Sequence, residues 1–135
     1  MKKKDKDKRY CRGDLVWVDL GHHFEKHVQA GRRLCLIVST DKGNNTVFTV
    51  MPGTSKLEKA DFPVHVTVRK YDTKGGMAKT TVFMAEQLVT VDRQDILMKV
   101  GCVNKDSGVM GKINSVIKRQ LEICLLYTSP SPRDS

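Results

Sequence analysis

A turn signal between two apolar runs is the feature that most restricts how this chain can fold. The turn, Asp-Lys-Gly-Asn-Asn, occupies residues 41–45, and the apolar runs cover residues 34–39 and 46–51. The pattern predicts an antiparallel β-hairpin, and a tight turn at the Gly-Asn step pairs residues whose numbers sum to 87. Arg33 and Thr54 then face each other at the open end of the hairpin. A permanent cation beside a hydroxyl group predicts a binding site for an anion such as phosphate.

The remaining apolar segments indicate a mostly β chain. Further strands are expected at residues 15–20, 64–68 and 81–85, and a short helical turn is expected at residues 93–97. Valines alternate with other residues along 64–68, so His65 is expected on the solvent side of its strand.

One helix is predicted after the last strand. Asp106 and Ser107 are both suitable N-caps for it. Apolar residues follow at spacings of three and four, at Val109, Met110, Ile113, Val116, Ile117 and Leu121. Five short strands and one C-terminal helix predict a mostly β, α+β fold built as a small, strongly bent sheet or half-open barrel.

The net charge of +9 is distributed unevenly along the 135 residues. Residues 1–9 carry six cations and two anions, which predicts a disordered basic tail before a single folded domain at residues 10–123. The positive charge within the domain favours a polyanionic partner, most commonly a nucleic acid. Residues 124–135 lack periodicity and resemble the translation of a sequencing-library transposon adapter, so a non-native or disordered tail is expected there.

Several classes of protein and site are disfavoured by what the sequence lacks. No stretch approaches the ~20 apolar residues of a membrane span, and no apolar signal segment follows the N-terminal cations. The four cysteines include no CxxC pair, so free thiols in a cytoplasmic protein are expected, with Cys35 buried. A glycine-rich phosphate loop, a nucleophile elbow and an acidic metal cluster are missing, so no metal and no cofactor is expected.

The loop between the first two expected strands is polar and basic and carries one aromatic side chain. Phe24 can stack on an unpaired base, and Lys26, His27 and Gln29 can contact RNA beside it. An ordinary surface loop is the alternative interpretation. A zinc site built from the three histidines of this loop is also conceivable, but no cysteine or carboxylate is placed to complete its ligands.

Six segments resemble, in order and spacing, one family of bacterial toxins. The first is Arg-Gly-Asp-Leu-Val-Trp-Val-Asp-Leu at residues 12–20, and another is Met-Pro-Gly-Thr-Ser-Lys at residues 51–56. The others are residues 28–33, 36–39, 62–66 and 85–92. Together they resemble the MazF/PemK toxins of type II toxin–antitoxin systems over about residues 10–123. The resemblance implies a small SH3-like half-open barrel of the MazF/CcdB kind that forms a homodimer.

The same resemblance implies an endoribonuclease that cuts single-stranded RNA, including mRNA, at selected sequences and needs no metal. The 2′-hydroxyl would attack the adjacent phosphate, leaving 2′,3′-cyclic phosphate and 5′-hydroxyl ends, and a cognate antitoxin protein would hold the enzyme inactive. Arg33 matches the family's catalytic arginine, and Thr54 matches its catalytic threonine. Positions along the RNA groove are matched by Gln29, Ser55, Lys56 and Gln87.

Two positions depart from the family pattern. Leu34 stands where proline usually follows the catalytic arginine, and Gly53 stands where an aliphatic residue usually precedes the catalytic threonine. Because glycine leaves the backbone freer, Gly53 predicts a loosely held Thr54 and a less efficient site. His27, where serine is common, is a candidate acid or base for the reaction.

The alternative function is a non-catalytic toxin or nucleic-acid-binding module on the same barrel, such as a CcdB-like gyrase inhibitor. Glu86 and Gln87, just after a buried strand, either bring an amide to the hairpin end or have a structural role. The pairing of Arg33 with Thr54 favours the ribonuclease, because a gyrase inhibitor needs neither residue.

Overall fold

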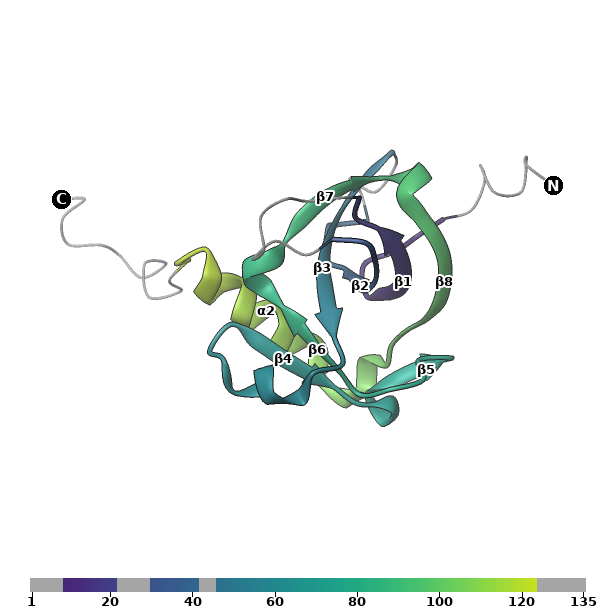
Figure 1. Ribbon diagram of the computed structural model, residues 1–135. Helices are drawn as coiled ribbons and strands as arrows, with labels where there is room; N and C mark the ends of the chain where they lie inside the picture. The colour runs from purple at the N-terminus through teal and green to yellow at the C-terminus, as the bar shows by residue number, and fades with distance from the viewer. Residues whose placement is uncertain (1–8, 22–29, 42–45, 124–135) are drawn as a thin grey trace, which may run out of the picture.

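The computed structural model describes residues 9–21, 30–41 and 46–123, which form a curled sheet with one α-helix packed against it (Figure 1). The strands are β1 (Asp14–Asp19), β2 (Arg32–Ile37), β3 (Val47–Thr54), β4 (His65–Val68), β5 (Thr73–Gly75), β6 (Thr81–Met84), β7 (Val89–Asp92) and β8 (Ile96–Val103). The helix is α2 (Val109–Gln120). Short 3₁₀ turns link the strands, at η1 (Leu57–Asp61), η2 (Lys70–Asp72), η3 (Ala85–Gln87), η4 (Arg93–Asp95) and η5 (Lys105–Ser107).

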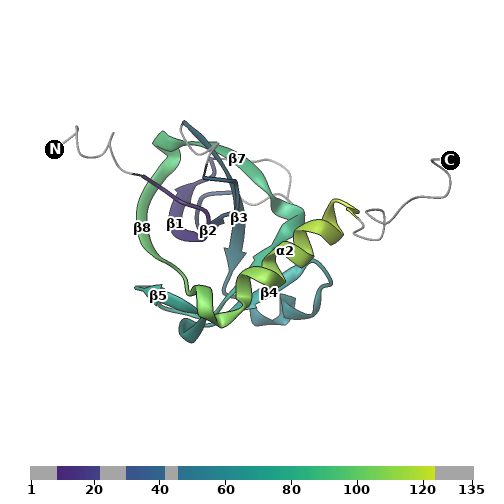
Figure 2. The same ribbon diagram turned by 180° about the vertical axis from the view of Figure 1, so that it is seen from behind.

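The strands pair in the order β4-β6-β3-β2-β1-β8-β5, and β7 also pairs with β3. All of these pairs are antiparallel, and the sheet bends so that β7 and β8 curve around β1, β2 and β3 (Figure 1). Figure 2 shows α2 lying beside β4 on the other side of the sheet. The predicted mostly β half-barrel with a single C-terminal helix is therefore confirmed.

Three strands, β5, β7 and β8, are present in addition to the five expected ones. The expected helical turn at residues 93–97 is shorter than predicted, because η4 ends at Asp95 and Ile96 already belongs to β8. β8 lacks a clear alternation because its register against β1 shifts twice, and each shift breaks the period of two that marks a strand in sequence.

The core has two parts, one on each face of the sheet. Alternate residues of β1 separate them: Leu15 packs in the part that α2 covers, whereas Val16 and Val18 pack in the part inside the curl. α2 contributes the buried side chains Val109, Ile113 and Val116. The expected N-caps of this helix, Asp106 and Ser107, are wrong by two residues and by one, because Gly108 is the N-cap, with a φ of 80°. Ser107 still accepts a hydrogen bond from the Val109 N–H at 3.2 Å.

The predicted hairpin register is confirmed. Cys35 pairs with Pro52, Leu36 with Met51 and Ile37 with Val50, and each pair sums to 87. The turn itself falls partly on residues 42–45, which lie outside the described residues, as do residues 1–8 and 124–135 of the two expected tails. In the part of the chain that is described, no helix is long and apolar enough to cross a membrane.

Candidate active site

A hollow of about 360 Å³ lies at the open end of the β2–β3 hairpin. Arg33 and Thr54 both line it, as the hairpin arithmetic predicts. The residues around the hollow are Trp17, Arg32, Arg33, Leu34, Gly53, Thr54, Ser55, Met77, Ala78, Lys79 and Thr81. They come from β1, β2, the end of β3 and the segment leading into β6, so several parts of the sheet converge on one site.

Arg33 is held near the start of β2. Its backbone pairs with Val18 of β1, its side chain is half-buried, and its Nε donates a hydrogen bond to the backbone oxygen of Ala30 at 3.2 Å. Because this bond uses Nε, it orients the planar guanidinium while the terminal nitrogens can point elsewhere. Such a fixed cation suits a phosphate oxygen.

Thr54 is the last residue of β3 and is buried. At this point β3 has changed partner, since Gly53 and Thr54 pair with Phe83 and Val82 of β6. The Thr54 Oγ1 accepts a hydrogen bond from the Lys56 N–H at 3.2 Å. The hydroxyl therefore accepts from the backbone and retains its own proton for donation to another acceptor, such as an anion in the hollow.

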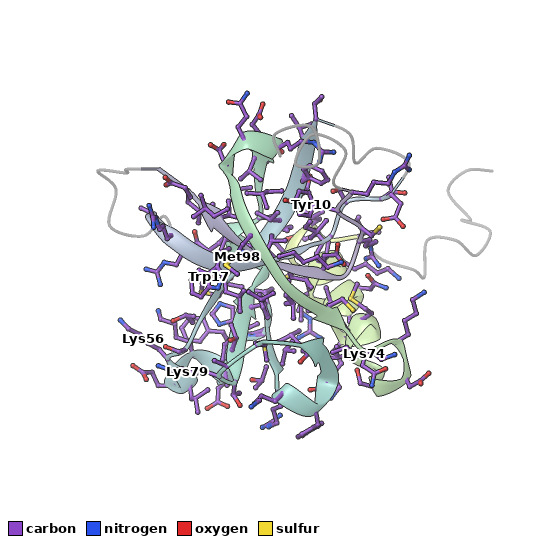
Figure 3. The ribbon with its side chains drawn as sticks, turned by 90° about the vertical axis from the view of Figure 1, so that its right-hand side faces the viewer. Tyr10, Trp17, Lys56, Lys74, Lys79 and Met98 are labelled. Atoms are coloured by element: carbon purple, nitrogen blue, oxygen red, sulfur yellow. The ribbon has the colours of Figure 1, made fainter. Side chains whose placement is uncertain are left out.

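The charge of the lining is positive. Arg32, Arg33 and Lys79 line the hollow, and none of its lining residues is acidic. Trp17, with 39% of its surface exposed, adds an aromatic ring. Figure 3 shows Trp17, Lys56 and Lys79 along the same side of the molecule. A cationic rim with an aromatic ring favours a single-stranded nucleic acid over a small neutral ligand.

The predicted RNA-contacting residues do not all gather here. Ser55 lines the hollow and the exposed Lys56 follows it in the chain, whereas Gln87 lines a separate hollow of about 550 Å³. That second hollow also includes Pro52 of β3 and, at the end of β1, residues 19–21. The other predicted contacts, Phe24, Lys26, His27 and Gln29, lie outside the described residues.

Six residues line the hollow that the sequence alone did not assign to it, namely Trp17, Arg32, Met77, Ala78, Lys79 and Thr81. The position of Trp17 could have been inferred from the alternation of β1, which places its side chain on the opposite face of the strand from the buried Val16 and Val18. Trp17 shares the face of Leu15 but is exposed. The position of Lys79 could not have been inferred, since the segment between β5 and β6 has no periodicity that predicts it.

His65 is buried, not on the solvent side as expected from alternation. Its position at the first residue of β4 places the ring against η1 and η3, which the strand pattern does not indicate. Cys11, Cys35 and Cys102 are free thiols, and Cys35 is buried as predicted. Within the described ranges, no group of three or more metal-ligating side chains occurs.

Comparison with known proteins gives consistent results for sequence and fold. A family described as PemK-like, MazF-like toxin of type II toxin-antitoxin system matches residues 11–121. Endoribonuclease EndoA of Bacillus subtilis is 28% identical over 116 residues, covering 83% of this chain and 94% of the relative. Endoribonuclease MazF of Staphylococcus saprophyticus is 30% identical over 108 residues, covering 78% of this chain and 86% of the relative. A crystal structure of MazF from Deinococcus radiodurans has a TM-score of 0.71 at 22% identity, and the match covers 87% of this chain and 100% of that one.

Proposed function

Because this chain belongs to the PemK-like, MazF-like toxins of type II toxin-antitoxin systems, we propose that it cuts single-stranded RNA at selected sequences without a metal. The main support for this proposal is that Arg33 and Thr54 line the same hollow, where a guanidinium and a hydroxyl proton are available to one anion. That anion is the scissile phosphate. Residues 10–123 form the toxin domain, in agreement with the extent of the family match.

The reaction is an internal transfer at phosphorus. The 2′-hydroxyl loses its proton as its oxygen attacks the adjacent phosphorus, and the bond to the 5′-oxygen breaks as that oxygen gains a proton. The products carry a 2′,3′-cyclic phosphate and a 5′-hydroxyl group. Negative charge grows on the non-bridging oxygens during this step, so fixed donors there lower the barrier. Arg33 supplies the charge and Thr54 a hydrogen bond. An arginine keeps its proton at physiological pH, so Arg33 acts by electrostatic stabilisation and not as the base. The required 2′-hydroxyl makes the enzyme specific for RNA.

The RNA follows a path from the hollow along its basic rim. Ser55 and Lys56 contact the strand next to the scissile phosphate, and Gln87 contacts it from the neighbouring hollow. Phe24, Lys26, His27 and Gln29 complete the contacts, and His27 is a candidate acid or base. Unchanged cleavage by a His27→Ala variant would exclude that role for His27.

The partners follow from the family. A cognate antitoxin protein holds the toxin inactive, in keeping with the toxin-antitoxin family match. The acting form in this proposal is a homodimer. We place it in the cytoplasm, where mRNA is accessible and where thiols such as the exposed Cys11 stay reduced.

The test incubates the purified protein with a long single-stranded RNA in EDTA and maps the cut ends. We expect discrete cuts with cyclic phosphate ends, and a loss of about 10²–10³-fold in Arg33→Ala and in Thr54→Ala. Lys105→Ala and Thr40→Ala are controls, since both residues are exposed and neither lines the hollow. Cleavage equal in all variants would refute the assignment. RNA binding without cleavage would favour the nucleic-acid-binding alternative.

A further inference from the structure

His65 joins three elements through a polar cluster outside the hollow. Its side chain is 1% exposed, and both of its ring nitrogens face oxygen atoms. Nδ1 lies 2.7 Å from the backbone oxygen of Lys59 in η1, and Nε2 lies 2.8 Å from Oε2 of Glu86 in η3. The ring of Phe62 stacks on the imidazole, with 4.8 Å between centroids and 6° between planes. The imidazole is thus fixed in position and in rotation.

The contacts tie the ring to η1 on one side and to η3 on the other. The Lys59 backbone oxygen and the Glu86 carboxylate both lie within hydrogen-bond distance of it. A buried imidazole that loses one of these partners is left with a polar atom that makes no hydrogen bond, which destabilises the arrangement.

Other charged groups surround the pair. Arg69, Lys112 and Arg119 line the same outer hollow as His65, and Arg119 donates to the backbone oxygen of Pro63 at 3.0 Å. The turn η1 carries the side chains of Glu58, Lys59 and Asp61. Among the described charged groups, Glu86 is the one that contacts the ring directly, and 32% of its own side chain is exposed.

The pair connects the chain segments next to the proposed site. η1 begins at Leu57, directly after the Thr54–Lys56 turn, and Glu86 precedes Gln87 in η3. We propose that His65 and Glu86 are positioning residues for RNA cleavage, whose hydrogen bond holds η1 against η3 and so keeps the Thr54–Lys56 turn in place. The inference rests on the proposed ribonuclease function, and it adds two residues outside the hollow to those that the reaction requires.

The test compares kcat and KM for RNA cleavage in the wild type, Glu86→Ala and Glu86→Gln. Alanine removes the partner of Nε2, whereas a glutamine side chain can still form a hydrogen bond with it. We expect kcat to be roughly tenfold lower in Glu86→Ala, the effect of one hydrogen bond to a charged group. Glu86→Gln should stay near the wild-type kcat, and KM should change less than kcat in both variants. Glu58→Gln, on the exposed side of η1, should keep the wild-type kcat.

A second measurement does not depend on activity. Hydrogen exchange of the backbone amides in η1 and η3 should be faster in Glu86→Ala than in the wild type, and close to the wild type in Glu86→Gln. A wild-type kcat in Glu86→Ala, or unchanged amide exchange in η1 and η3, would overturn the inference. A wild type that never cuts RNA overturns the ribonuclease proposal as well, whereas cutting at the wild-type kcat by Glu86→Ala overturns only this one.

Discussion

Gly53 packs directly against Thr81, because a Cβ atom at position 53 would overlap the Thr81 methyl group and lie 3.0 Å from the Phe83 ring. Its φ is not among the positive values found at other glycines, so the backbone conformation does not require glycine. The β3–β6 ladder also runs through Gly53 to Thr54, which restrains the backbone that glycine alone would leave free. The glycine that departs from the family pattern here therefore fits the packing of Thr81 and the pairing of β3 with β6.

This packing predicts that Gly53→Ala lowers the free energy of unfolding by about 1–3 kcal/mol, the usual cost of overpacking a tight site. Urea unfolding measures the change. Thr81→Ser removes the methyl group and keeps a hydroxyl for the bond to the Lys79 oxygen, so the double variant should recover the part of the loss that this methyl group causes. Gly111→Ala is the control, since a Cβ there meets nothing within 4 Å and should stabilise the helix slightly. Additive effects of the two substitutions would contradict the packing argument.

The second prediction concerns the role of the Thr54 hydroxyl in cleavage. Thr54→Ser keeps both the bond from the Lys56 N–H and the donated proton, so it should retain most of the cleavage rate. Thr54→Val has nearly the same shape but cannot donate, and should lose about 10²-fold or more. Single-turnover cleavage of a labelled RNA measures the rates, with circular dichroism to confirm folding. A valine variant as active as serine would exclude the hydroxyl from the reaction.

Cys35 provides a prediction about stability at alkaline pH. Burial raises the pKa of its thiol from 9.0 to about 12, and the nearby Arg33 charge offsets part of that effect. Because the folded-state pKa lies above the unfolded one, the stabilisation is fully present below about pH 9 and is lost as the pH rises from there towards 12. The free energy of unfolding should therefore fall over this range more steeply in the wild type than in Cys35→Ala.

The comparison uses slopes and not absolute stabilities, because the alanine substitution has its own packing cost. Cys11→Ala is the matched control, because it removes an exposed thiol and leaves the buried surroundings of Cys35 unchanged. Equal slopes in the wild type and both variants would show that the Cys35 thiol ionises as easily in the folded chain as in the unfolded one.

The hairpin shows how far sequence reasoning extends for this fold. Turn chemistry and apolar runs are local, so they give the register of β2 and β3 and with it the approach of Arg33 to Thr54. Lys79 and Thr81 reach the same hollow through the pairing of β3 with β6, which depends on residues far apart in the chain. The solvent-side prediction for His65 is wrong for the same reason: period-two alternation describes one strand and contains no information about η1 and η3, which cover it.

The basic segment at residues 1–9 leads to a prediction about affinity. Its net positive charge should neutralise RNA phosphates independently of sequence, and each neutralised phosphate releases a counterion. Deleting residues 2–9 should therefore weaken RNA binding and make the plot of log affinity against log salt shallower, by about 0.7 for each single-strand phosphate that the segment neutralises. The rate at saturating RNA should stay the same, since Arg33 and Thr54 are untouched. Replacing four of the five lysines of the segment with glutamine at constant length removes the same net charge as the deletion. This variant is the control for chain length, and it should reproduce the deletion. An unchanged salt slope in both variants would show that the segment does not bind the RNA.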